Sequence, residues 1–311
     1  MEGNYSPVVL FVYNRPQHTY NLLNCIDNLD EAQHTELYVF SDGPKVKADD
    51  NIVKVREIIK EFAANNHFRK VHVCESQTNK GLATSIIEGV TQVINKYGRA
   101  IVLEDDLEVS SDFLAYMNAA LDAYKDNESI WAISAYTFPM KAFKDYKHDV
   151  YVSGRGCSWG WATWKDRWNT VDWKVNRYNE YKYNIVNRSR FASWGRDLPC
   201  MLDAYMYNEI HSWAIRWCFA AHLQNKYTIY PVCSRILNKG TDGSGTNYNK
   251  AKTTTFDTEL SVGNTCYFEN VLVDRKIQRE FSRKYLPLIE YVKVNIRWFL
   301  IKIRLLHAHV K

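Results

Sequence analysis

The chain has 311 residues, 46% hydrophobic and 24% charged, with a net charge of +5, which is typical of an ordinary globular protein. It contains no run of 18 apolar residues and no basic segment followed by an apolar one near its start, so we expect neither a membrane span nor a signal peptide. No block of five lysines or arginines occurs, which argues against a nucleic-acid partner. Seven scattered cysteines without CxxC spacing indicate reduced thiols and a cytoplasmic protein.

The first third of the chain alternates between strand and helix patterns. Short apolar, β-branched runs predict strands over 7–13, 36–40, 70–74 and 100–103. Apolar residues at helical spacing predict helices over 17–27, 49–65, 81–96 and 107–123. This alternation predicts an α/β fold of the Rossmann-like kind, with a mostly parallel sheet flanked by helices.

The second half of the chain is less regular. Residues 151–173 are rich in aromatic residues and glycine, and residues 178–219 have a helical pattern with breaks. A late strand is predicted over 227–236 and helix over 274–311. No linker or repeat divides the chain, so we expect one domain over 1–265 followed by a helical tail over 266–311.

Three carboxylates, Glu104-Asp105-Asp106, directly follow the fourth predicted strand. Adjacent like charges repel one another and usually have a cation or hydrogen-bond donors to compensate them. Hard oxygen ligands favour Mg²⁺ or Mn²⁺, which commonly keep phosphate oxygens as further ligands. The alternative is an acidic cluster that complements the dipole of the helix predicted over 107–123, with a cap from 110–112. The position of the triplet after a buried strand favours the metal.

Three other polar segments fall near predicted strand ends: Asn14-Arg15-Pro16, Ser41-Asp42-Gly43 and Asn79-Lys80-Gly81. Each alone is an ordinary polar loop. Ligands of parallel α/β sheets bind beyond the carboxyl ends of the strands, where these segments and the acidic triplet meet. Together they predict a ligand site at this edge.

The order of VYNRP, SDG, NKGL and VLEDDLEVSSDFL resembles the nucleotide-sugar half of inverting GT-A fold glycosyltransferases of the bacterial family-two type. It is especially similar to N-acetylglucosaminyltransferase I-like enzymes, whose signature is an EDD triplet. The segments SWGWATW, SWAIRW and DGSGTN extend the resemblance, which spans about residues 6 to 250. It implies a nucleotide-sugar half over 1–125 and an acceptor half over 126–265. It further implies transfer from a UDP-sugar to a glycan or polyprenyl-linked acceptor.

The resemblance also implies roles for individual residues. Those implied to bind the nucleotide-sugar are Asn14, Arg15, Asp42, Lys80, Gly81, Glu104 and Asp105. Asp106 is implied to bind Mn²⁺ or Mg²⁺. The residues implied to form a loop near the sugar or acceptor are Arg155, Trp159, Gly160 and Trp161.

An inverting transferase needs a base that takes the proton of the acceptor hydroxyl. Relatives carry an aspartate beside a tryptophan here, whereas Trp213 is followed by no acid. The candidates are His211, which has a suitable ordinary pKa, Glu209, and Asp242 in the glycine-rich loop. His211 could equally be a surface residue. Asn247 stands where some relatives have a metal-contacting histidine.

The tail combines apolar residues at helical spacing with basic ones. The apolar residues are Ile289, Val292, Ile296, Phe299, Leu300, Ile303 and Leu306. The basic residues among them are Lys293, Arg297, Lys302 and Arg304, and no acid follows Glu290. This pattern is typical of a helix on an anionic membrane surface, while docking of the apolar face on the domain is the alternative.

Two other classes of function compete with the transferase. A nucleotidyltransferase would also use an acidic metal site, but it usually carries a glycine-rich basic loop after its first strand, which VYNRP is not. A non-catalytic carbohydrate-binding relative is the third class, because the acid expected after Trp213 is missing.

Overall fold

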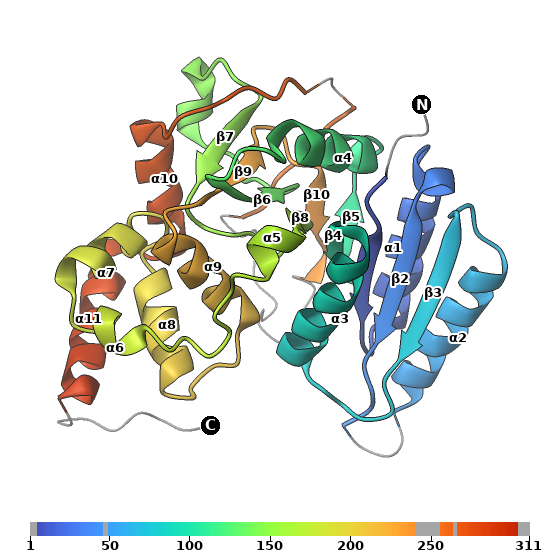
Figure 1. Cartoon of the computed structure of the whole chain (residues 1–311), viewed down its shortest axis with the longest axis horizontal. Helices are drawn as coiled ribbons and strands as arrows, with labels where there is room; N and C mark the ends of the chain where they lie inside the picture. The colour runs from blue at the N-terminus through green and yellow to red at the C-terminus, as the bar shows by residue number, and fades with distance from the viewer. Residues whose placement is uncertain (1–4, 46–48, 241–255, 264–265, 304–311) are drawn as a thin grey trace.

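One eight-stranded sheet runs through the molecule in the strand order β3-β2-β1-β4-β8-β6-β9-β7 (Figure 1). The computed structural model describes residues 5–45, 49–240, 256–263 and 266–303. The strands of this sheet are β1 (Val8–Val12), β2 (Glu36–Ser41), β3 (Lys70–Glu75), β4 (Arg99–Glu104), β6 (Ile130–Ser134), β7 (Val150–Ser153), β8 (Trp161–Trp164) and β9 (Tyr227–Pro231). A separate antiparallel pair joins β5 (Leu107–Val109) to β10 (Ile236–Asn238).

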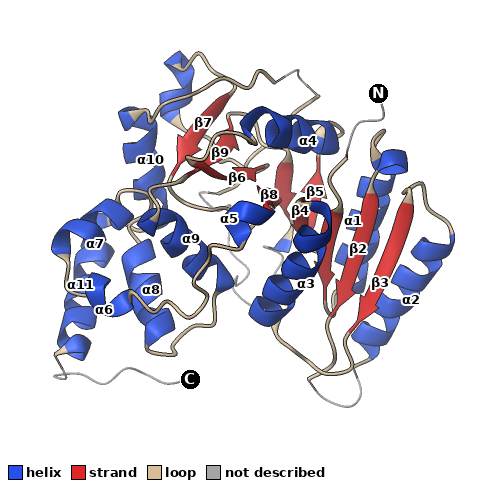
Figure 2. Ribbon diagram, viewed as in Figure 1, coloured by secondary structure: helices blue, strands red, loops and turns tan. Residues whose placement is uncertain are grey.

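Helices cover both faces of the sheet (Figure 2). The α-helices are α1 (Pro16–Asp27), α2 (Asp50–Ala64), α3 (Leu82–Tyr97), α4 (Phe113–Tyr124), α5 (Lys165–Trp168), α6 (Tyr178–Tyr181), α7 (Ile185–Ala192), α8 (Leu198–Met206), α9 (Trp213–Leu223), α10 (Arg275–Tyr285) and α11 (Leu288–Lys302). Two short 3₁₀ helices are η1 (Ala32–His34) and η2 (Lys141–Asp145). Among the described residues, none of these helices has the length and apolar character that a membrane span requires.

The central strand β1 separates two cores, because successive side chains of a strand point to opposite faces. Val8, Leu10 and Val12 pack in the core formed with α1, α2 and α4. Val9 and Phe11 pack in the other core, with α3 and α9. All five residues of β1 are buried, which explains why this strand is continuously apolar.

The predicted fold class is confirmed, and the four early strands are parallel as expected. The later strands make the sheet mixed, since β8 is antiparallel to β4 and β6, and β7 is antiparallel to β9. The helix predicted over 107–123 is wrong at its start. Residues 107–109 form β5, because pairing with β10 overrides the local preference, and α4 begins at Phe113.

The predicted C-terminal helix is divided into α10 and α11. Pro287 lies directly before α11, where its fixed φ angle and missing N–H are compatible with a helix start but not with a continuous helix.

Candidate active site

The carboxyl ends of β1, β2 and β4 lie side by side at one edge of the sheet. In the parallel register Val12 pairs with Ser41, and Phe11 pairs with Glu104. The polar segments that follow these strands are therefore adjacent in space although they are far apart in the sequence.

Arg15 joins the ends of β1 and β4. Its Nη1 donates to Asp106 Oδ2 at 2.9 Å, and its Nη2 donates to Asp105 Oδ1. Pro16 occupies the first turn of α1, so the helix begins immediately after Arg15 and holds this residue at the strand end. The guanidinium of Arg15 is thus engaged within the acidic cluster, which we define as Glu104, Asp105 and Asp106.

The acidic cluster contains three carboxyl groups, and the Arg15 guanidinium contacts two of them. Asp105 is 2% exposed, and burial raises its pKa to about 6 although Arg15 opposes the shift. Burial, with the nearby Asp106 and Asp105 carboxylates, raises the pKa of Glu104 to about 8. Asp105 Oδ2 is buried and has no hydrogen-bond partner in the described part of the protein. One arginine therefore leaves the cluster under-compensated, as expected where a further cation binds.

The backbone of residues 239–240 packs against Asp106. The N–H of Lys239 donates to the Asp106 carbonyl at 2.7 Å. A Cβ atom at Gly240 would collide with the Asp106 carboxylate, so glycine lets this side chain keep its position. This contact was not predicted, since nothing in the local sequence connects residue 240 with residue 106.

The donor set suits a hard divalent cation whose ligands come only partly from the protein. Within the described ranges, no three His, Cys, Asp or Glu side chains are grouped to hold a metal ion by themselves. The Asp105 oxygen without a hydrogen-bond partner and the partly accessible carboxylate of Asp106 are the groups of the acidic cluster that could contact such a cation. Phosphate oxygens of a bound ligand would have to complete such a site.

Asp42 ties the end of β2 to the start of α3. Its carboxylate accepts from the backbone N–H groups of Gly43, Lys80 and Gly81 at 2.8–2.9 Å, and from the side-chain amide of Asn79 at 3.1 Å. Gly81 has a φ angle of 75°, a conformation that favours glycine. Lys80 extends to an exposed ion pair with Glu88. Asp42 therefore holds the loop in place. Asn14, which follows β1, is partly exposed.

The residues expected near the sugar or acceptor lie mainly in packed surroundings. Arg155 forms a two-bond ion pair with Asp197 and stacks on Tyr285 at 3.6 Å. Trp161 is buried in a stack of tryptophans, so its indole supports the fold. Gly160 has a φ angle of 62°, and a Cβ there would collide with Ile236. Trp159 packs edge-on against Tyr136 and is partly exposed.

The three candidate bases differ in their surroundings. The Glu209 carboxylate is paired with Arg297 of α11. His211 is exposed in the segment just before α9. Asp242 and Asn247 lie outside the described residues, and Asp242 follows Gly240 by two positions.

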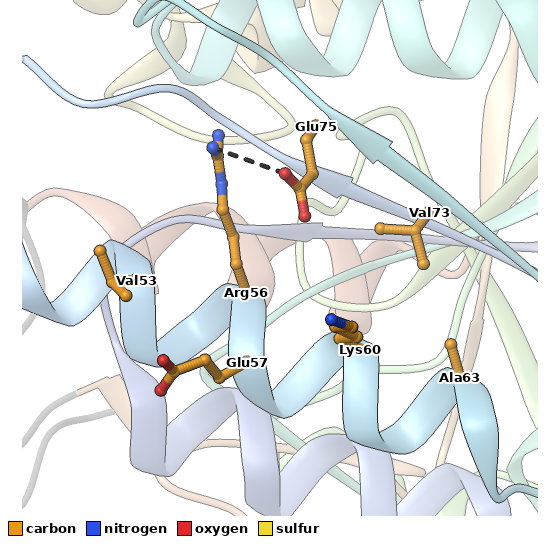
Figure 3. Close-up of a pocket in the computed structure, with 7 residues that line it drawn as sticks. All are labelled: Val53, Arg56, Glu57, Lys60, Ala63, Val73 and Glu75. Atoms are coloured by element: carbon orange, nitrogen blue, oxygen red, sulfur yellow. Dashed lines mark ion pairs between the residues drawn. The ribbon is translucent and has the colours of Figure 1, made fainter.

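Two surface hollows are lined by residues between 40 and 92. One, between α2 and β3, is lined by Val53, Arg56, Glu57, Lys60, Ala63, Val73 and Glu75 (Figure 3). It contains none of the acidic cluster, and Arg56 crosses it to pair with Glu75 at 3.5 Å. The other includes Asp42 and Lys80 at the ends of β2 and β3. The second belongs to the edge where the strand ends gather, and we assign the site to that edge.

Residues 88–179 match the model of the GNT-I family. This stretch contains the acidic cluster and the loop at 155–161. The match confirms over this stretch the resemblance to N-acetylglucosaminyltransferase I-like enzymes. No curated protein sequence matches the chain.

Two solved structures show the extent of structural similarity. The mannosyltransferase PcManGT from Pyrobaculum calidifontis, in complex with GDP-Man and Mn²⁺, is 14% identical with a TM-score of 0.37, covering 52% of this chain and 46% of that one. TarS from S. aureus is 17% identical with a TM-score of 0.29, covering 41% of this chain and 21% of that one. The chain thus spans less than half the length of either.

Proposed function

We propose that the protein is an inverting glycosyltransferase that moves a hexose or N-acetylhexosamine from a UDP-sugar to a hydroxyl of a glycan acceptor. The observation that carries this proposal is the acidic cluster at the end of β4, with one arginine against three carboxylates and an unsatisfied buried oxygen on Asp105. The GNT-I family match over residues 88–179 includes this cluster and supports the same activity.

We propose Asp106 as the protein ligand of Mn²⁺ or Mg²⁺, with Asp105 close enough to share in binding. When bound, the metal would neutralise charge on the departing diphosphate. Arg15 holds both carboxylates in place, so its role is to position the metal ligands rather than to contact the uridine itself. Glu104 is the remaining carboxylate of the cluster, and we propose that it orients the donor sugar.

The nucleotide is proposed to lie between Asn14 and the loop that Asp42 holds. Because the Asp42 carboxylate already accepts four N–H groups, its contribution is to fix the backbone of Lys80 and Gly81. Trp159 is the residue of the 155–161 loop that combines partial exposure with an aromatic face, and it is our candidate for contact with the sugar or acceptor.

The general base is proposed to be Asp242, with His211 as the alternative. Asp242 follows Gly240, whose backbone packs on Asp106, so the chain enters the segment containing it from beside the proposed metal ligand. Glu209 is less suitable, because its ion pair with Arg297 stabilises the carboxylate and occupies it. The base would take the proton of the acceptor hydroxyl as that oxygen attacks C1 of the sugar.

The acceptor is proposed to be a polyprenyl-linked glycan presented at the cytoplasmic surface of an anionic membrane. The basic and apolar composition of α10 and α11 supports this placement. A non-catalytic carbohydrate-binding protein is the second candidate, favoured by the missing acid after Trp213.

Titration of UDP by calorimetry, with and without Mn²⁺, tests the donor site. We expect Mn²⁺-dependent binding in the natural protein and at least a hundredfold loss of transfer in Asp106→Asn. Asp122→Asn is the matched control, because Asp122 is an exposed carboxylate in α4. Metal-independent UDP binding, or full turnover in Asp106→Asn, would contradict the proposal.

The base is tested by UDP release and transfer across an acceptor panel. We expect Asp242→Asn to bind UDP normally and to lose transfer, while His211→Asn retains it. The reverse result assigns the base to His211. UDP binding without transfer to any acceptor in the natural protein favours the carbohydrate-binding alternative.

A further inference from the structure

Helix α11 has two apolar faces. Trp298 and Ile301 are 1% and 5% exposed and pack against Cys200 of α8. A second set of apolar side chains is exposed and recurs at intervals of three and four residues: Ile289, Val292, Ile296, Phe299 and Ile303. At 100° per residue, this exposed row lies on the side of the helix opposite Trp298 and Ile301. Docking on the domain therefore leaves one apolar row in contact with solvent.

The exposed row continues onto a second segment. Tyr183, Ile185 and Val186, at the start of α7, are also exposed. The Tyr183 hydroxyl donates to the carbonyl of Lys302 at 3.3 Å, which places this segment beside the end of α11. We call these three residues and the exposed row of α11 together the α7–α11 surface. Contiguous exposed apolar area of this kind marks an interaction site.

Positive charge is concentrated in the C-terminal segment that contains α10 and α11. Residues 275–311 contain ten lysines and arginines against two acidic residues, whereas the rest of the chain contains thirty against thirty-three. In α10, Arg275, Lys276, Arg279 and Arg283 are exposed, and none forms an ion pair with another described residue. Buried Ile277 lies on the opposite side of this helix. Figure 1 shows α10 and α11 along one side of the molecule, away from α2 and β3.

We propose that the α7–α11 surface inserts shallowly into an anionic lipid bilayer, with the basic face of α10 held against the headgroups. Aromatic and aliphatic side chains beside unpaired basic ones are what such an interface requires. A second copy of the chain would bring the same positive charge against it, which opposes self-association. The inference rests on the proposed function in one respect, which is that the proposed acceptor is attached to a lipid. Binding of the protein to the membrane does not itself require glycosyl transfer.

Vesicle co-sedimentation tests the surface. We expect the natural protein to bind vesicles of phosphatidylcholine with 30% phosphatidylserine, to bind pure phosphatidylcholine at least tenfold less, and to be released by 0.5 M salt. Ile296→Ser/Phe299→Ser should reduce binding at least tenfold, and Arg275→Gln/Arg279→Gln should weaken it on anionic vesicles. Val53→Ser is the matched control, because Val53 is 55% exposed and Ile296 is 56% exposed.

Two further measurements make the result decisive. UDP binding and melting temperature should be unchanged in every variant, so that loss of vesicle binding is separated from failure of the donor site or of folding. The proposal is overturned if the natural protein does not sediment with anionic vesicles, or if the serine variant sediments equally well. It is also overturned if ultracentrifugation shows a dimer that the serine variant abolishes while vesicle binding persists.

Discussion

Arg15 shows how the contacts of a residue can differ from those that its position in the sequence suggests. It follows the first strand, where a nucleotide would lie, but its guanidinium turns to Asp105 and Asp106. A buried carboxylate without a partner is costly, so the most favourable use of Arg15 in the folded chain is to compensate these acids. The proposed metal would then complete the compensation.

His222 is a residue whose protonation state is controlled by packing. Its ring lies 4.8 Å from that of Phe191 and near those of Phe219 and Tyr181. Burial, with a smaller contribution from Arg190, lowers its pKa to about 4. In the unfolded chain the imidazole would titrate near its ordinary pKa of about 6.5. The folded state therefore binds this proton less readily than the unfolded state.

This difference predicts a pH dependence of stability. The contribution of His222 is complete above about pH 6.5 and is lost as the pH falls toward 4, because the unfolded state gains the proton first. Between pH 7 and pH 5, we expect the free energy of unfolding to fall by about 1–2 kcal/mol less in His222→Phe than in the natural protein. Urea unfolding at several pH values measures this. Exposed His34, changed to Phe, is the control. The same pH dependence in His222→Phe and the natural protein would refute the role of burial.

At the scale of elements, Asp42 joins β2 to α3. Its two oxygens accept four N–H groups, three of them from the backbone. The Asp42 carboxylate fixes the conformation of the loop before α3, because each of these N–H donors would otherwise be left without a partner. If Asp42 instead contacted the nucleotide directly, its substitution would lower the UDP affinity without lowering the stability of the protein. Measuring both quantities separates the structural role from the binding role.

We expect Asp42→Asn to lower stability by about 2 kcal/mol, because the amide presents a donor to N–H groups that need an acceptor. The melting temperature and the UDP affinity should fall together. Asn79→Ala, which removes only one donor to Asp42, should cause a smaller loss of both. If Asp42→Asn loses UDP affinity while its melting temperature is unchanged, Asp42 contacts the nucleotide directly.

Local pattern was sufficient to predict the early elements and the sheet edge at which we propose the site. Strands β1 to β4 are apolar runs ending in polar segments, so the positions of Asp42 and Asp106 follow from the parallel sheet. The strand β8 was missed because Trp161 and Trp164 resemble ligand-binding aromatics when their neighbours in space are unknown. The pairing of Arg15 with Asp105 spans 90 residues, and no local pattern contains it.

At the scale of the whole molecule, a buried charge network joins the C-terminal helix α11 to helices α6, α7 and α8. Asp203 of α8 is fully buried and accepts from both terminal nitrogens of Arg188, from Lys302 at 2.8 Å and from the Tyr178 hydroxyl at 2.8 Å. Burial lowers the pKa of Lys302, so this lysine depends on Asp203 for its charge. The network connects α6, α7, α8 and α11, and it holds the exposed row of α11 in a fixed orientation.

Removing the charge of Asp203 should therefore release α11 rather than merely weaken one contact. In Asp203→Asn, Arg188 and Lys302 become buried cations without a counter-ion, and we expect a loss of about 3 kcal/mol in stability. Trypsin should cleave within α11 several times faster under native conditions, because that helix is the element that can detach. Glu290→Gln breaks only the exposed pair with Lys293 and should change stability by less than about 0.5 kcal/mol. Equal melting temperatures and cleavage rates for Asp203→Asn and Glu290→Gln would show that packing of Trp298 and Ile301 alone holds the helix.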